Sequence, residues 1–240
     1  SPETIQIADT IGLHDIYYDN TGTLQESTSH DLKTILYDNA YVSNVYWNNI
    51  DSESIFVGDE RHGKDLPYKI HEYLHFYIGT QYNSGLSLSD FTIGNGSSDS
   101  HAQFSISDGQ ISDEDVDHII TDDNPQDLSP IANIPILYKL GNNGYWYKTT
   151  ANNFPVIYGA DYAGTLLPYN EWTGTTWQLT ELTNNDFVLV HYFATNNINY
   201  PIVGIQGQQE YTNKPDAFDG APEEINNIVL EGLPSPEMKA

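Results

Sequence analysis

Apolar and polar residues alternate over many short stretches of the chain, and Gly, Asn, Asp or Pro separates one stretch from the next. A period of two places successive side chains on opposite faces of a β-strand, and the separating residues are those that turns require. The stretches predicted as strands are 4–9, 13–18, 41–47, 54–58, 85–93, 102–107, 134–140, 145–149, 154–158, 164–169, 176–182, 187–195 and 202–206. Short strands at regular spacing predict a mainly β protein, folded as an antiparallel β-sandwich or in a jelly-roll-like way.

Two segments carry a different pattern and predict short helices at about 66–78 and 221–231. In the first, apolar residues recur at intervals of three and four, Pro67 suits the first turn and Gly79 suits the end. The same segment also alternates and is rich in Tyr, Phe and Ile, so a strand stays an alternative there. In the second, Asp219 can cap the first turn, and Ile225 and Val229 share an apolar stripe. Residues 31–37 could wind briefly as well.

The length of 240 residues suits one large β domain or two modest ones. We expect an N-terminal segment of strands at 1–54 and a β-rich main domain at 55–240. Pro125 and Pro130 bound the best candidate for a linker.

The charge balance excludes two classes of partner. The chain holds 8 Lys and Arg against 34 Asp and Glu, which gives a formal net charge of −26. Such a surface repels phosphate backbones and anionic bilayers, so we expect neither nucleic acid binding nor membrane insertion. Acidity of this degree suits salty water or the binding of divalent cations. The sequence contains no cysteine, so disulfides and thiol chemistry are excluded.

His71, Glu72 and His75 form an H-E-x-x-H motif within the first predicted helix. On a helix the two imidazoles lie one turn apart and can share a Zn²⁺, with Glu72 as the base that takes a proton from metal-bound water. A catalytic zinc needs a third protein ligand, and no His or Glu follows His75 before Asp90. The sequence therefore leaves open a zinc metallopeptidase, a structural metal held by the two histidines, or a metal between subunits.

Asp113, Asp115 and Asp117 recur at a spacing of two and form a candidate Ca²⁺ cluster. The EF-hand pattern fails because His118 stands where glycine is required. The alternative is a solvated acidic face. If the cluster binds Ca²⁺, a calcium-dependent carbohydrate-binding module is a further hypothesis.

Four aromatic residues stand beside predicted turns, where exposed rings could stack on the faces of sugars. They are Trp146, Tyr147, Trp172 and Trp177. The alternative is that each ring packs in the core or against another subunit.

Several stretches together resemble virion structural proteins of tailed bacteriophages, marine ones in particular. They are GDERHG at 58–63, YIGTQYNSGLSL at 77–88, DGQISDED at 108–115, IPILYKLG at 134–141, DFVLVHYFATN at 186–196, GIQGQQEY at 204–211 and LEGLPSPE at 230–237. The likeness covers most of the chain from about residue 55 onward and is closest to tail or head-fibre components.

The resemblance implies a β-rich protein that assembles with copies of itself and with other virion proteins in an extracellular particle. It supplies no catalytic residue and no required cofactor, although Ca²⁺ or Zn²⁺ stays an expectation from the motifs. We therefore expect a structural protein rather than an enzyme, with contact to a host surface glycan as a further role. The zinc metallopeptidase and the calcium-dependent module are the alternatives.

Overall fold

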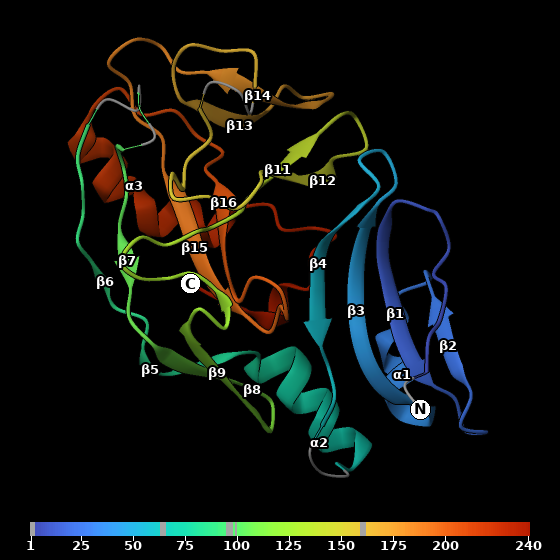
Figure 1. Ribbon diagram of the computed structural model, residues 1–240. Helices are drawn as coiled ribbons and strands as arrows, with labels where there is room; N and C mark the ends of the chain where they lie inside the picture. The colour runs from blue at the N-terminus through green and yellow to red at the C-terminus, as the bar shows by residue number, and fades with distance from the viewer. Residues whose placement is uncertain (1–2, 63–65, 95–97, 99, 159–161) are drawn as a thin grey trace.

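The computed structural model describes residues 3–62, 66–94, 98, 100–158 and 162–240, and it is mainly β, as the alternating pattern predicts (Figure 1). Within these ranges the strands form three larger sheets and two sheets of two strands each. The helical elements are α1 (Leu32–Asp38), α2 (Tyr68–Tyr73), a π-helical turn η1 (Leu74–Ile78), α3 (Lys214–Asn227) and a 3-10 turn η3 (Ser235–Glu237).

The N-terminal sheet has the strand order β2-β1-β3-β4 and is antiparallel throughout. Its strands are β1 (Gly12–Tyr18), β2 (Leu24–Ser27), β3 (Ala40–Asn48) and β4 (Glu53–Asp59). The boundary expected between residues 54 and 55 is wrong, because it cuts through β4, which pairs with β3 along its whole length. The strand expected at 4–9 is also absent. There Asp9 accepts hydrogen bonds from the side chains of Trp47 and Asn49 instead.

The central sheet has the order β12-β11-β16-β15-β17 and is buried on both faces. Its strands are β11 (Ile136–Leu140), β12 (Tyr145–Lys148), β15 (Val190–Thr195), β16 (Ile202–Gln206) and β17 (Met238–Lys239). β11 and β16 run parallel, and the other pairs are antiparallel. Because side chains alternate between faces, Val203 packs with Phe56 of the N-terminal sheet, whereas Ile202 packs in a second core with Ile111.

The third sheet, β10-β9-β8-β5, covers the other face of the central sheet. Its strands are β5 (Gln81–Gly85), β8 (Gly109–Asp113), β9 (Val116–Asp122) and β10 (Pro125–Gln126). The linker expected at 125–130 is wrong, because Gln126 exchanges two hydrogen bonds with the backbone of Ile202 and Leu128 is fully buried. The three sheets therefore form a sandwich-like stack of layers rather than separate units.

The two small sheets lie at the margins of this stack. They are β6 (Leu88–Ser89) with β7 (Ser105–Ile106), and β13 (Pro168–Trp172) with β14 (Trp177–Glu181). The strands expected at 85–93 and 102–107 thus shrink to two residues each, and 154–158 forms none. In that last segment Phe154 and Ile157 are buried from irregular backbone, so the apolar pattern reflects burial without strand pairing.

Helix α3 begins seven residues before the predicted start at 221, since Asn213 rather than Asp219 is its cap. The side chain of Asn213 accepts a hydrogen bond from the backbone N–H of Asp216 at 2.9 Å. Pro222 consequently lies inside the helix, which ends at Asn227 instead of 231. The helix expected at 66–78 is confirmed as α2 and η1, and Figure 1 shows it between the N-terminal sheet and the turn that joins β8 to β9.

Candidate metal centre

Helix α2 and its π turn present histidine, not apolar side chains, to the interior. His71 and His75 are 8% and 2% exposed, whereas Tyr73 and Tyr77 are 54% and 74% exposed. The apolar stripe that predicts the helix therefore faces outward. The π turn closes where the Gly79 N–H donates to the Leu74 carbonyl, five residues back, at 2.8 Å.

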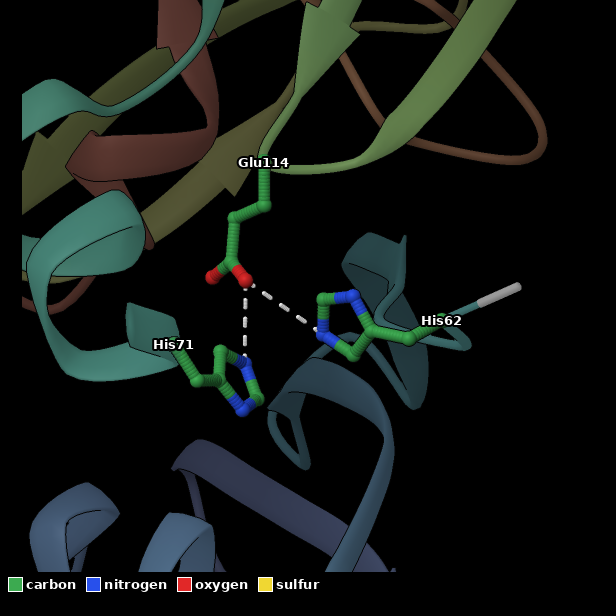
Figure 2. A group of neighbouring side chains, drawn as sticks. All are labelled: His62, His71 and Glu114. Carbon is green, nitrogen blue, oxygen red and sulfur yellow. Dashed lines mark ion pairs between the residues drawn. The ribbon is translucent and has the colours of Figure 1, made fainter. Parts of the chain in front are cut away.

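The first cluster of possible ligands is His62, His71 and Glu114 (Figure 2). His71 Nε2 lies 3.0 Å from Glu114 Oε2, and His62 Nε2 lies 3.5 Å from the same oxygen. His62 follows β4, His71 belongs to α2, and Glu114 stands at the turn between β8 and β9. Figure 2 shows both imidazoles directed at the carboxylate from one side. The cluster thus joins three segments that are distant in sequence.

The hydrogen bonds around this cluster leave its donor atoms directed at one another. His62 Nδ1 lies 2.6 Å from Asp115 Oδ1, which assigns the proton to Nδ1 and leaves the Nε2 lone pair facing inward. Three atoms at the centre of the cluster are buried and have no hydrogen-bond partner. They are His62 Nε2, His71 Nε2 and Glu114 Oε2. A carboxylate on the far nitrogen of an imidazole is the usual support for a metal-binding histidine.

A second cluster lies beside the first and consists of Glu60, His75 and Glu237. All three residues are buried, with exposed fractions of 3%, 2% and 1%. His75 Nδ1 lies 3.3 Å from Glu237 Oε1 and 2.9 Å from Glu114 Oε1. Glu114 therefore contacts the first cluster with one carboxylate oxygen and the second cluster with the other.

Buried amides support the second cluster. Asn44 donates to Glu60 Oε1 at 2.6 Å, and Asn196 donates to the same oxygen at 2.9 Å and to Asp113 Oδ2 at 2.9 Å. Gly58 permits this arrangement, because a Cβ at that position would lie 2.6 Å from the Asn44 amide oxygen. The amides hold the carboxylates in place without neutralising them.

Burial dominates the protonation of these acids. It raises the pKa of Glu60 well above its usual range, and the nearby Asp113 raises it further. Burial likewise raises the pKa of Glu237, with Glu60 and Asp113 adding to the effect. Burial also favours the neutral form of Glu114, but contact with His71 and His75 outweighs it and holds the pKa of Glu114 below its usual value.

Glu72 does not take the position that a metallopeptidase base requires. Its carboxylate accepts a hydrogen bond from Lys69 at 2.9 Å and lies 3.7 Å from Lys33 of α1. The hydrogen bond from Lys69 holds the pKa of Glu72 below its usual value. Two lysines already engage the Glu72 carboxylate, and this pairing disfavours the predicted role as the base.

The three aspartates of the expected Ca²⁺ cluster do not converge, so that prediction is wrong. Asp113 is buried beside Asn196, Asp115 pairs with His62, and Asp117 accepts from Ser112 Oγ at 2.6 Å. The β8–β9 hairpin separates them, because residue 113 ends one strand and residue 117 lies on the other. Among the described residues these acids form no ligand group with one another.

The four aromatic candidates divide between core and surface. Trp146 is 1% exposed and donates from its indole to the Glu231 carbonyl, so for this ring the alternative of core packing holds and a role in sugar stacking does not. Tyr147 is half-buried and stacks on Tyr138. Trp172, which is 46% exposed, and Trp177 line a groove of about 270 Å³ with their ring centres 5.5 Å apart.

Sequence reasoning found His71 and His75 but missed their partners. Glu114 stands between the aspartates that the period of two selects, so a strand pattern passes over it. Its φ of +52° is unusual for a residue with a side chain, and its contacts with two imidazoles give the position a reason. Glu60 and His62 occur close together at 58–63, which was the one available signal.

Comparison with known proteins adds no relative: no family model, curated protein or solved structure matches the chain. In the ranges that the structure describes, no helix is both long and apolar enough to span a bilayer.

Proposed function

We propose that this chain is a structural component of a phage particle in which a zinc ion, held by His62, His71 and Glu114, fastens the N-terminal sheet to the β8–β9 hairpin. The geometry of those three residues carries the proposal. A tetrahedral zinc with bonds of about 2.0–2.1 Å places its ligand atoms roughly 3.3 Å apart. The separations of 3.0 and 3.5 Å in the cluster fit that requirement.

A structural role follows from where the ligands come from. They tie β4, α2 and the β8–β9 turn together in a chain that has no cysteine to form a disulfide. Glu114 and His71 have side chains that are 2% and 10% exposed, so the donor set is largely enclosed. Enclosed sites are typical of structural zinc, whereas catalytic zinc keeps an open position for water.

The particle assignment is supported by the resemblance and by the surface. The exposed stripe on α2 and η1, which includes Ile70, Tyr73 and Tyr77, is an apolar surface of the kind that another copy of the chain would cover. The groove at Trp172 and Trp177 supports the further proposal of contact with a host glycan.

A zinc hydrolase is the second candidate, because two histidines and one glutamate are the ligand set of several zinc peptidases. The side chain of His62 is 15% exposed, which would give water one approach. The pairing of Glu72 with Lys69 and Lys33 favours the structural role instead.

Zinc content and thermal stability of the full chain test the proposal. We expect the wild type to retain zinc after dialysis and to unfold at a lower temperature when EDTA is added. Zinc at a hundred times its Kd would stabilise the fold by about 2.7 kcal/mol. His62→Ala and Glu114→Gln should lose the zinc of this cluster and the share of the EDTA effect that depends on it, whereas His30→Ala, a half-exposed histidine paired with Asp15, should keep both.

A wild-type chain that binds no zinc and ignores EDTA would refute the proposed centre. Proteolysis of casein separates the two candidates. The structural role predicts none from the wild type or from Glu72→Gln, and zinc-dependent cleavage that Glu72→Gln abolishes would establish the hydrolase.

A further inference from the structure

The second cluster poses a problem of charge that the first ion does not solve. Four carboxylates are buried close together here, each at most 5% exposed. They belong to Glu60, Asp113, Glu114 and Glu237. Among the described residues no lysine or arginine forms an ion pair with any of them. Carboxylates are seldom buried unless a positive group or a metal compensates them.

We infer that Glu60, His75 and Glu237 bind a second divalent cation, and that Glu114 bridges it to the first through its two carboxylate oxygens. This inference rests on the proposed ion at His62, His71 and Glu114 and extends it to a centre of two metals. Two divalent ions would then balance the four buried carboxylates, three of them as ligands (Glu60, Glu114 and Glu237) and Asp113 as a neighbour.

The donor geometry supports the bridge. His75 Nδ1 lies 3.3 Å from Glu237 Oε1 and 2.9 Å from Glu114 Oε1, which are again separations between neighbouring ligands of one small cation. Both oxygens of Glu237 are buried and have no hydrogen-bond partner. Two fully buried carboxylate oxygens without a hydrogen-bond partner are unfavourable unless a cation contacts them.

The amides and the ligand types indicate the class of ion. Asn44 and Asn196 both donate to Glu60 Oε1, which fixes that carboxylate from the side of the N-terminal sheet. Two or three carboxylates with one imidazole suit ions that accept mixed oxygen and nitrogen ligands, such as Zn²⁺ or Mn²⁺. The enclosure of Glu60, His75 and Glu237 makes this second ion structural.

The second ion would attach η3 to the rest of the fold. Glu237 is the last residue of η3 and directly precedes β17, the edge strand of the central sheet. Glu60 follows β4, so the ion would join that edge to the N-terminal sheet.

Counting zinc ions per chain by native mass spectrometry tests the inference on the full-length wild type and on variants. We expect two ions in the wild type and in Glu223→Gln, an exposed acid on α3. One ion should remain in His62→Ala and one in Glu237→Gln, and Glu114→Gln should weaken both sites at least tenfold.

The outcomes separate the two proposals. No zinc in the wild type overturns both. The second site alone is overturned if the wild type holds one zinc, which His62→Ala removes and Glu237→Gln retains. It is also overturned if Glu237→Gln still holds two ions. If the variants fail to fold, the wild type is titrated with Co²⁺ and followed by electron paramagnetic resonance, which tests whether two bound ions are bridged. Spin coupling that appears with the second equivalent supports the bridge, and two uncoupled ions overturn it.

Discussion

Glu224 is a buried acid, 2% exposed, that connects helix α3 to the loop after β16. Its Oε1 accepts from the backbone N–H of Gln208 at 2.7 Å, and its Oε2 accepts from the Tyr211 hydroxyl at 2.8 Å. Burial disfavours its charge, but contact with His191 and these hydrogen bonds outweigh burial and hold its pKa below the usual value. The ionised form is therefore the one that the fold stabilises.

The charge of Glu224 predicts a pH-dependent loss of stability in Glu224→Gln. A depressed pKa adds stability above the unfolded value of 4.5, and this stability disappears as the pH falls through the folded pKa. At pH 7 we expect the variant to lose about 1.5–3 kcal/mol in urea denaturation, with the deficit shrinking below pH 4. Glu223→Gln, an exposed neighbour, serves as the control, and an equal deficit at pH 7 and pH 3 would contradict the assignment.

At the level of residues, spacing along the sequence identified only ligands that lie on one element. His71 and His75 are one helical turn apart, so a motif can find them. His62 and Glu114 meet His71 through tertiary packing, and no local pattern carries that information. A period of two selects every second residue, so it picked Asp113, Asp115 and Asp117 and passed over Glu114 between them.

At the level of elements, the end of the α2 and η1 helix depends on one backbone conformation. Gly79 has φ of 59° and ψ of −171°, a backbone conformation that residues other than glycine rarely adopt. Its N–H closes the π turn on Leu74, next to the ligand candidate His75. The conformation of Gly79 therefore positions the histidine-bearing turn.

Gly79→Ala should destabilise the protein by about 1–3 kcal/mol through strain at this position. We expect the midpoint of chemical denaturation to fall with an unchanged dependence on denaturant. Tyr77→Ala, an exposed position on the same turn, is the control and should change stability by less than about 0.5 kcal/mol. Equal stability of Gly79→Ala and the wild type would show that the turn relaxes.

The elements themselves could mostly be predicted, but their ends could not. The strands at 136–140, 145–148 and 202–206 follow the alternation within a residue or two. α3 has two suitable caps, Asn213 and Asp219, and a proline that suits the first turn of the later start. Only the earlier start places Ala217 in the helix, where it is buried, and a local sequence pattern does not reveal that tertiary burial.

At the level of the whole molecule, Trp146 joins the N-terminal sheet to the central sheet. Its backbone N–H donates to the Tyr46 hydroxyl at 3.1 Å, and its carbonyl accepts from the Asn48 side chain at 3.0 Å. The indole packs in the core that Phe56 and Leu137 share. The two sheets therefore share one core.

Trp146→Ala should cost about 3–5 kcal/mol, because it leaves a large cavity between two sheets. Trp172→Ala removes an exposed ring and should change stability by less than about 1 kcal/mol, although it should weaken any glycan binding. Calorimetry of the wild type should show a single transition. Separate transitions for residues 12–59 and for the remainder would contradict the joint core.

The mainly β class could be predicted from alternation, but the order of the sheets could not. β16 is buried along its whole length, and continuous burial is compatible with several pairings. The pairing of β15 with β17 and of β11 with β16 connects segments far apart in the chain. Such partners are selected by packing across layers, which a one-dimensional pattern does not contain.

The position of Glu237 bears on how the protein is made. During translation, residues 12–122 leave the ribosome long before η3 and β17, so the nascent chain exposes its imidazoles and acids without the last ligand. β15 also gains its β17 neighbour only at that late stage. Metal uptake at the second cluster would then follow synthesis of the preceding sheets, and a ribosome stalled before residue 235 should hold a chain that keeps one zinc at the first cluster and binds no second ion tightly.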